Sequence, residues 1–209
     1  MIWLWRRACI AAIPNLLPRD AHVVDLMAGT GEVLPHLLKR FPGINKITAI
    51  EISAGMHAEA VERLHQGREK RITHLNANAL ETDLPEGIAD CVISTFGLKT
   101  FNKDQQAVLA RQVARLLKPG GTFSLIEAGD PVRWRLRPLY RFYMTRCLPA
   151  VELLFLKGAQ DFSMIGQYTA QFVDCAHFAE CLHKEGLLVT QTAYVFGCAS
   201  GVAGHKPAG

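Results

Sequence analysis

The sequence lacks the residue patterns that mark a metal site or a disulfide framework. Its six cysteines are scattered, no two of them have C-x-x-C spacing, and no two histidines have H-x-x-x-H spacing. We therefore expect no bound metal ion, and cysteines used in this way are typical of a reducing cytosol. The spacing of polar residues also shows no Ser-His-Asp triad and no catalytic pair of carboxylates.

Long apolar runs are missing as well. Residues 1–13 are largely apolar, but Arg6 and Arg7 interrupt them, and only about six apolar residues follow before Pro14. That run is too short for a signal peptide core or a membrane span. We expect an amphipathic helix over residues 2–14 and a cytoplasmic protein, whose contact with a membrane, at its inner face, would be peripheral.

The composition fits one globular domain. The chain has 209 residues, of which 49% are hydrophobic and 20% charged, and its net charge is +4. No repeat, low-complexity tract or linker interrupts it, which predicts a single domain over residues 1–209. The mild positive charge permits an acidic partner but does not indicate nucleic acid.

Residues 23–32, with the sequence VVDLMAGTGE, are the most informative stretch. Two valines lead into Asp25, two glycines follow one residue apart, and a helix-forming segment covers residues 32–40, which predicts a strand, a tight turn and a helix. Glycine lets a ligand approach the backbone, and a helix start attracts anions. Leu34 stands where dinucleotide-binding enzymes have a third glycine. Two glycines alone favour a ligand site no more than an ordinary turn.

A carboxylate ends the next expected strand. Residues 46–51 read KITAIE, and Glu51 lies about 20 residues beyond the glycine loop. Nucleotide-binding α/β folds place an acidic residue there, because one carboxylate accepts hydrogen bonds from both vicinal ribose hydroxyls. We favour this role for Glu51 over that of a solvated strand end.

Strands and helices alternate along most of the chain. Asn102 and Gln105 form a capping box for a helix that ends at Leu117, residues 130–170 form a helical insertion, and the last helix covers residues 175–185. Further strands are expected at residues 72–75, 89–94, 122–127, 187–194 and 195–205, the last two as an antiparallel hairpin. The pattern predicts an α/β fold with a doubly wound, mostly parallel, seven-stranded sheet of Rossmann-like type, whose ligands lie at the carboxyl ends of the strands.

Several motifs together carry a resemblance to a known family. They are Asp25-Leu26-x-x-Gly29-Thr30-Gly31, Asn78-Ala79, Phe96-Gly97-Leu98, LLKPGG at residues 116–121, Arg137-Pro138-Leu139-Tyr140, Tyr168 and Gly201-Val202-Ala203-x-His205-Lys206. With them the chain resembles the ubiquinone/menaquinone C-methyltransferase family over nearly its whole length. The resemblance implies a class I methyltransferase that uses S-adenosylmethionine to methylate a prenylated quinol or a similar phenolic, lipid-soluble acceptor in quinone biosynthesis.

The resemblance also implies a set of residues that bind the cofactor. They are Asp25, Ala28, Gly29, Thr30, Gly31, Glu51, Ile52, Met56, Asn78, Ala79, Thr95 and Phe96. The glycine loop would hold the methionine end and Glu51 the ribose hydroxyls. The residues from Ile52 to Ala79 in this set would lie around the adenine, and Thr95 and Phe96 would line the floor between cofactor and acceptor.

Three residues are candidates for the chemistry. Lys99 could stabilise the phenolate form of the acceptor, Tyr168 could hydrogen-bond to it, and Glu127, at the end of the fifth strand, could act as a polar group in the cleft. A solvated loop lysine is an equally good interpretation of Lys99, and a packed aromatic residue is an equally good interpretation of Tyr168.

Two features depart from the family pattern. Family members usually have Arg-Asn after Phe-Gly-Leu, whereas this chain has Lys99 and Thr100, which puts a point charge in place of a bidentate donor. Family members also carry a segment with an aromatic lid before the element that reads LWRR at residues 4–7 here. We expect either that the lid is absent or that the start of the reading frame was placed too late.

The arginine-rich helix expected at residues 133–146 admits three interpretations: a solvated face, a docking surface for anionic lipid helped by Trp134, Phe142 and Tyr143, or a nucleic-acid patch. The second fits a lipid-soluble acceptor. We expect no nucleic-acid partner, because the fourth strand ends in Ser-Thr-Phe-Gly and not in the Asn/Asp-Pro-Pro-aromatic loop of many methyltransferases that act on base amino groups. A homodimer is also among the expectations.

Two other functions stay open at this point. The protein could methylate another small metabolite or a phospholipid headgroup in specialised metabolism, an alternative that the change to Lys99 and Thr100 favours. It could also be a scaffold that binds S-adenosylmethionine without transferring its methyl group.

Overall fold

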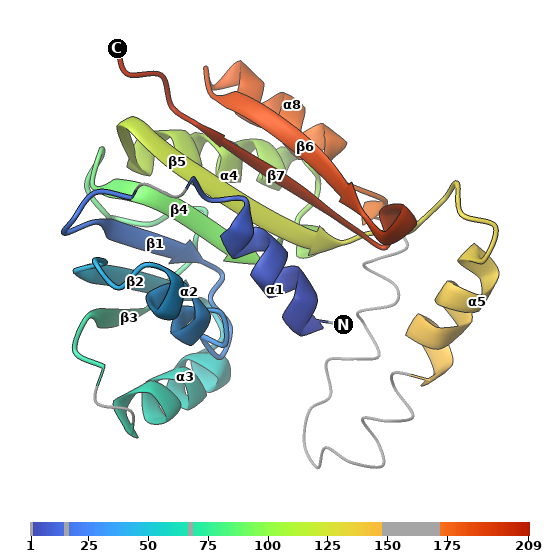
Figure 1. Cartoon of the computed structure of the whole chain (residues 1–209), viewed down its shortest axis with the longest axis horizontal. Coiled ribbons are helices and arrows are strands. Elements are labelled where there is room, and N and C mark those ends of the chain that lie inside the picture. The colour runs from blue at the N-terminus through green and yellow to red at the C-terminus, as the bar shows by residue number, and fades with distance from the viewer. Residues whose placement is uncertain (1, 15–16, 67–68, 148–171) are drawn as a thin grey trace.

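Seven strands form one sheet in the computed structural model, which describes residues 2–14, 17–66, 69–147 and 172–209 (Figure 1). The strands are β1 (His22–Leu26), β2 (Lys46–Glu51), β3 (Ile72–Asn76), β4 (Ala89–Thr95), β5 (Leu117–Ala128), β6 (Leu188–Tyr194) and β7 (Ala199–His205). Their order is β3-β2-β1-β4-β5-β7-β6, and β7 runs antiparallel to both of its neighbours. The predicted doubly wound, mostly parallel sheet is confirmed.

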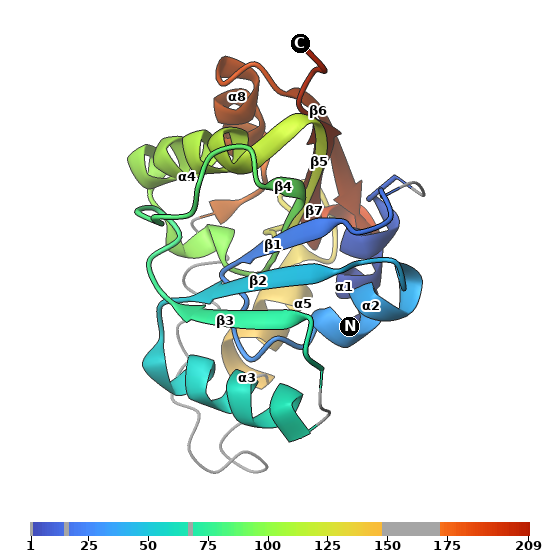
Figure 2. The same cartoon turned by 90° about the vertical axis from the view of Figure 1, so that its left-hand side faces the viewer.

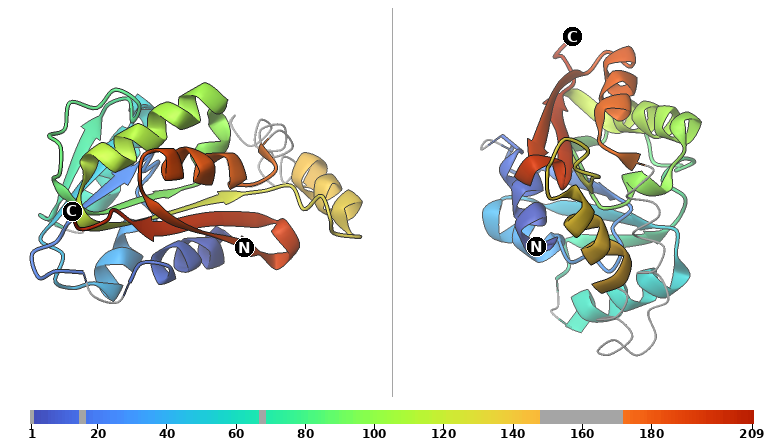
Figure 3. Two further views of the ribbon diagram at one scale, coloured as in Figure 1. Left: turned by 90° about the horizontal axis from the view of Figure 1, so that it is seen from above. Right: turned by 90° about the vertical axis from the view of Figure 1, so that its right-hand side faces the viewer.

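Helices cover both faces of this sheet. They are α1 (Ile2–Ala11), α2 (Leu34–Arg40), α3 (Ala54–Gln66), α4 (Lys103–Leu116), α5 (Arg137–Phe142) and α8 (Ala176–Lys184). Viewed from above, α1 and α2 lie below the sheet and α4 and α8 above it (Figure 3). Val23 and Ile47 pack toward α1 and α2, whereas Val24 and Ile50 pack toward α4 and α8. Because both faces are buried, the parallel strands are nearly continuous apolar runs.

The capping box of α4 is confirmed. The Asn102 side chain accepts a hydrogen bond from the Gln105 backbone N–H at 2.9 Å, and the Gln105 side chain accepts one from the Asn102 N–H at 3.0 Å. These two bonds satisfy donors that the first turn of a helix leaves without partners. The helix therefore begins where the sequence predicts.

Several boundaries differ from the sequence prediction, and the first helix, expected over residues 2–14, ends at Ala11. The helix after the glycine loop begins at Leu34 and not at residue 32, and Val33 stands at its N-cap without a capping side chain. Strand β5 begins at Leu117 and not at Thr122, since Leu117 already pairs with Ala89. The last strand begins at Ala199 because a short helical turn, η3 (Val195–Gly197), precedes it.

The chain reverses its direction of progress across the sheet between β1 and β4. From β1 it proceeds to β2 and β3 at one edge, then returns to add β4 on the other side of β1 (Figure 2). The loops after β1 and β4 consequently leave the sheet toward opposite faces. Open α/β sheets bind their ligands at such a switch point, beyond the carboxyl ends of the strands.

The helical insertion follows β5. Its described part is α5 and the π-helical turn η2 (Tyr143–Cys147), which stand beyond the end of β5 (Figure 1). The expected helix at residues 133–146 thus begins at Arg137, and residues 148–171 lie outside the described part of the chain. Among the helices described, none has the length and apolar character to cross a membrane.

We predict that Asn102→Ala lowers the free energy of unfolding by about 1 kcal/mol, because the Gln105 N–H loses its acceptor. The melting temperature should fall by roughly 2–4 °C, measured by circular dichroism. Asn102→Asp keeps the acceptor oxygen and serves as the control, with a melting temperature close to that of the wild type. Equal losses in both variants would contradict the assigned cap.

Candidate functional site

The glycine loop folds back over the end of β1. Gly29 and Gly31 have φ of +57° and +70°, a conformation that residues with a side chain rarely adopt. The Ala28 N–H donates to the Ile50 carbonyl at 2.8 Å, and the Gly31 N–H donates to the Ala28 carbonyl at 2.9 Å. A Cβ atom on Gly29 would meet no protein atom within 4 Å. Gly29 therefore faces open space at the switch point.

The Glu51 carboxylate joins the loops after β1 and β2. It is 8% exposed, and its two oxygens accept hydrogen bonds from the Gly29 and Ser53 backbone N–H groups, each at 2.8 Å. The structure thus brings Glu51 directly to the glycine loop. A carboxylate has about four acceptor positions, so further donors can still bind to it.

The loops after β2 and β3 are tied together by Asn76, which sequence reasoning missed. Its side-chain N–H groups donate to the Glu51 carbonyl at 2.8 Å and the Ile52 carbonyl at 3.1 Å. The side chains of Ile52 and Met56 are 67% and 37% exposed. These two residues therefore offer apolar surface beside Glu51.

The two candidates after β3 differ in what they present. Asn78 uses its side-chain oxygen to accept from the Leu80 N–H at 3.0 Å, which shapes the turn. Ala79 is buried among core residues at 4% exposure. Both residues therefore help to shape the backbone of this loop.

The loop after β4 is held by a buried ion pair. Phe96 has φ of +67°, and its N–H donates to the Ile126 carbonyl at 3.0 Å, just beyond the point where Thr95 pairs with the same residue. The Lys99 ammonium donates to the Phe96 carbonyl at 2.7 Å and to Glu127 Oε1 at 2.8 Å. The Lys99 and Glu127 side chains are 7% and 0% exposed. The interpretation of Lys99 as a solvated loop residue is therefore wrong, and Tyr168 lies outside the described residues.

Met27 connects the loops after β1 and β4. It has φ of +62°, and its Sδ atom would lie 2.5 Å from a Cβ atom on Gly97. Only glycine at position 97 leaves room for this side chain. The glycine of the Phe-Gly-Leu motif is thus explained by a contact that the sequence alone does not reveal.

Asp25 is fully buried, and neither of its oxygens has a hydrogen-bond partner among the described residues. Burial raises the pKa of Asp25 well above its usual range, the charge of Glu51 adds to the rise, and the charge of Arg6 opposes it. Native structures leave few buried polar groups without a partner, so such a group calls for a ligand or another explanation.

The groups at the switch point fit S-adenosylmethionine. Glu51 lies beside a loop that faces open space, and the buried Leu34 stands where a dinucleotide-binding loop has its third glycine. S-adenosylmethionine carries two ribose hydroxyls that can donate to the Glu51 carboxylate, and an ammonium and a sulfonium that acidic groups attract. The residues present therefore fit this cofactor.

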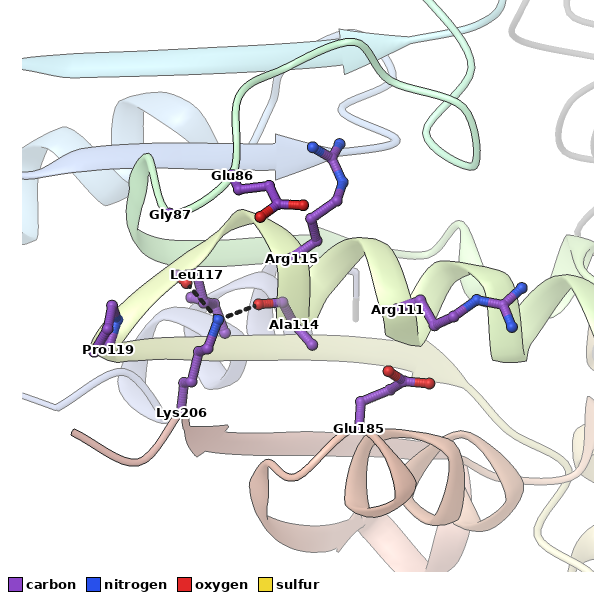
Figure 4. A pocket seen from close by; sticks show the side chains of 9 residues that line it. All are labelled: Glu86, Gly87, Arg111, Ala114, Arg115, Leu117, Pro119, Glu185 and Lys206. Atoms are coloured by element: carbon purple, nitrogen blue, oxygen red, sulfur yellow. Dashed lines mark hydrogen bonds between the residues drawn. The ribbon is translucent and has the colours of Figure 1, made fainter. Parts of the chain in front are cut away.

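A hollow of about 530 Å³ lies at the amino ends of β4 and β5, away from these loops (Figure 4). Two of its three cationic side chains, those of Arg115 and Lys206, already have backbone partners. Arg115 donates to the Thr82 and Leu84 carbonyls, and Lys206 donates to the Ala114 and Leu117 carbonyls. This hollow is not the candidate site.

The fold and the loops at its switch point define a class I methyltransferase dependent on S-adenosylmethionine. Residues 2–206 match the model of the ubiE/COQ5 methyltransferase family, and the chain belongs to that family. The predictions of a methyltransferase and of S-adenosylmethionine as its cofactor are confirmed.

Two relatives illustrate the similarity. A demethylmenaquinone methyltransferase from Lactiplantibacillus plantarum is 27% identical over 206 residues, which cover 98% of this chain and 85% of the relative. The ubiquinone/menaquinone biosynthesis C-methyltransferase UbiE from Proteus mirabilis is 26% identical over 204 residues, which cover 97% of this chain and 79% of the relative.

Solved structures share the fold. A methyltransferase dependent on S-adenosylmethionine from Aquifex aeolicus has a TM-score of 0.64 at 18% identity, over 91% of this chain and 84% of that one. Human N-acetylserotonin methyltransferase, solved with S-adenosylmethionine, has a TM-score of 0.68 at 20% identity, over 99% of this chain and 53% of that one.

We predict that Gly29→Val reduces binding of S-adenosylmethionine below detection in isothermal titration calorimetry, because the branched side chain would fill the open space beside Glu51. The matched control is Gly120→Val, since Gly120 also has positive φ and an open Cβ position but lies near the amino end of β5, away from the glycine loop. Both variants should lose about 1–2 kcal/mol of stability from backbone strain. Undiminished affinity in Gly29→Val would place the cofactor elsewhere.

Proposed function

We propose that this protein transfers the methyl group of S-adenosylmethionine to a prenylated quinol or a similar phenolic, lipid-soluble acceptor. The observation that carries the proposal is the family match over residues 2–206, together with relatives whose names refer to menaquinone and ubiquinone precursors. We also propose that the whole chain is a single methyltransferase domain, because one sheet takes strands from residue 22 to residue 205.

We propose that the cofactor is bound by the residues that the family resemblance implies, with Glu51 accepting from the ribose hydroxyls and the glycine loop beside the methionine end. When bound, S-adenosylmethionine supplies an electrophilic methyl group, to which the acceptor donates an electron pair while sulfur keeps the pair of the broken bond and the acceptor loses a proton. The protein holds the acceptor at attack distance and excludes water. Phe96 at the end of β4 supplies an apolar wall for this purpose.

Lys99 and Glu127 act as a unit in this proposal. Glu127 is fully paired, since its oxygens accept from the Lys99 ammonium, the Lys99 N–H and the Ala128 N–H. It therefore positions Lys99 and does not act as a base. Two of the three ammonium donors of Lys99 are used, which leaves one for an acceptor oxygen. Tyr168 remains a proposed second donor.

The described part of the insertion provides a surface for an anionic membrane. Arg137 and Arg141 pair with the buried Asp130, which anchors α5. Arg133, Arg135 and Arg146 are exposed and have no ion-pair partner among the described residues.

Apolar side chains lie on the same outward face of the insertion. Leu136, Leu139, Phe142 and Tyr143 are 40–63% exposed, and residues 131–147 contain no acidic side chain. We propose that this cationic and apolar face rests on anionic lipid at the inner face of the cytoplasmic membrane, where a lipid-soluble acceptor is collected. A homodimer stays a prediction.

We predict that methyl-labelled S-adenosylmethionine incubated with a lipid extract gives labelled product in the organic phase. Lys99→Met combined with Glu127→Gln removes the donor without leaving a buried charge unpaired. This variant should lose about 100-fold in kcat with its affinity for S-adenosylmethionine retained. Lys103→Met is the control and should keep wild-type turnover.

Two results of the labelling experiment would overturn the proposal of a lipid-soluble acceptor. Label confined to the aqueous phase would indicate methylation of a water-soluble metabolite. Cofactor binding with no labelled product in either phase would indicate a scaffold.

We predict that the protein sediments with vesicles that contain phosphatidylglycerol and not with vesicles of phosphatidylcholine alone. Arg133→Gln with Arg135→Gln removes two charges worth about 1 kcal/mol each, so partitioning should weaken about thirtyfold. Lys103→Gln with Lys184→Gln changes the net charge equally on other helices and should bind as the wild type does. Equal weakening in both variants would show a general effect of charge and contradict the docking face.

A further inference from the structure

Strand β6 forms one edge of the sheet and is open along its length. Among the described strands it pairs only with β7 (Figure 1). Five of its seven residues are exposed, and α8 lies beside it on one face of the sheet and not over its edge (Figure 3). The backbone N–H and C=O groups along this edge can therefore pair with another strand.

This strand lacks the features with which natural proteins block an open edge. Residues 186–204, which include all of β6, contain no Asp, Glu, Lys, Arg or Pro. The register of β6 against β7 is continuous over seven residue pairs, so no β-bulge twists the edge away. An uncharged, regular edge of this kind is a surface for pairing with another chain.

The opposite edge of the sheet is built differently. Strand β3 has five residues, of which two are exposed. Arg71, directly before it, pairs with Glu69 at 2.8 Å and so places charge at the start of the strand. Short strands and charged side chains are common protections of an edge. Of the two edges, β6 is therefore the one suited to a partner.

The sequence of β6, LVTQTAY, is nearly palindromic about Gln191. Two copies of one strand can pair antiparallel about a two-fold axis perpendicular to the sheet, and residues opposite each other then lie on the same face. With Gln191 opposite itself, Thr190 lies opposite Thr192 of the second copy, and Val189 lies opposite Ala193. Pairs of threonines and of apolar residues are favourable, and no like charges meet.

The ends of the strand match in the same register. Tyr194 packs against Trp5, with ring centres 6.0 Å apart, on the face of the sheet that α1 covers. Leu188, six residues earlier, lies on that face too and is 53% exposed. It would lie opposite Tyr194 of the second copy. Phe196, 72% exposed just beyond the strand, would approach the start of β6 in that copy. The pairing would therefore cover apolar surface that one chain leaves open.

We propose that β6 pairs antiparallel with β6 of a second copy of this chain, centred on Gln191. The two seven-stranded sheets then form one continuous sheet of two times seven strands. The partner follows from the strand itself, because its near-palindrome makes the edge complementary to its own copy. A single pair of strands is a small interface, so this dimer dissociates on dilution. The inference does not depend on the proposed acceptor.

The test is sedimentation velocity of the full chain at concentrations from about 1 to 100 µM. We expect the wild type to shift with concentration from the monomer mass of 23.1 kDa toward twice that mass. Gln191→Lys would place two ammonium groups opposite each other, and its dissociation constant should rise about tenfold. Gln191→Glu should weaken association in the same way. An equal mixture of these two variants should associate again, because an ammonium then lies opposite a carboxylate.

Thr73→Lys is the matched control, since Thr73 is exposed on the other edge strand and the change in charge is the same. Its association should equal that of the wild type.

Three results would overturn the proposal. A wild type that stays monomeric up to the highest concentration would show that the edge does not pair with its copy, and this measurement needs no variant to fold. A dimer that Gln191→Lys leaves as stable as the wild type would use another surface. A mixture of the two Gln191 variants that fails to associate would contradict the pairing of this residue with itself.

Discussion

Backbone donors at the switch point need acceptors that the sheet cannot supply, and two buried carboxylates meet this need. Where the loops after β1 and β4 leave the sheet, their N–H groups lose neighbouring strands as partners, and an unpaired buried N–H is costly. Glu51 accepts from the Gly29 and Ser53 N–H groups, and Glu127 accepts from the Lys99 and Ala128 N–H groups. The same two side chains therefore satisfy the backbone donors at this end of the sheet and shape the candidate site. Their burial is tolerable because each is hydrogen-bonded on both oxygens.

Asp25 shows the opposite situation. It sits at the end of the central strand, fully buried, without a donor among the described residues. A chain that satisfies Glu51 and Glu127 so completely could satisfy Asp25 in the same way, for instance with a hydroxyl in place of a neighbouring apolar residue. Leaving Asp25 without a donor costs stability, and a ligand that donates to it would recover that cost on binding.

The sequence predicts what depends on local pattern and misses what depends on contacts between distant segments. The alternation of apolar runs predicts the sheet, glycine spacing predicts the loop, and Asn102 with Gln105 predicts the start of α4, because each of these features acts within a few residues. The pairing of Lys99 with Glu127 joins residues 28 positions apart, and Arg6 reaches Glu32 beside the glycine loop only through the packing of α1. Neither contact has a local signature. The interpretation of Lys99 as solvated failed for this reason.

The proposed cofactor side and the proposed acceptor side of the molecule are built by different means. The cofactor side consists of short loops whose backbone conformations are determined by Gly29, Gly97 and buried carboxylates. The acceptor side begins with an insertion pinned on its inner face, where Asp130 pairs with Arg137 and the Tyr140 hydroxyl donates to the Gly129 and Cys198 carbonyls. These inward contacts hold α5 in place, so its position does not depend on packing by its outward residues. Under the proposed function, substitutions on that outward face would change how lipid or acceptor is bound and leave the cofactor side intact.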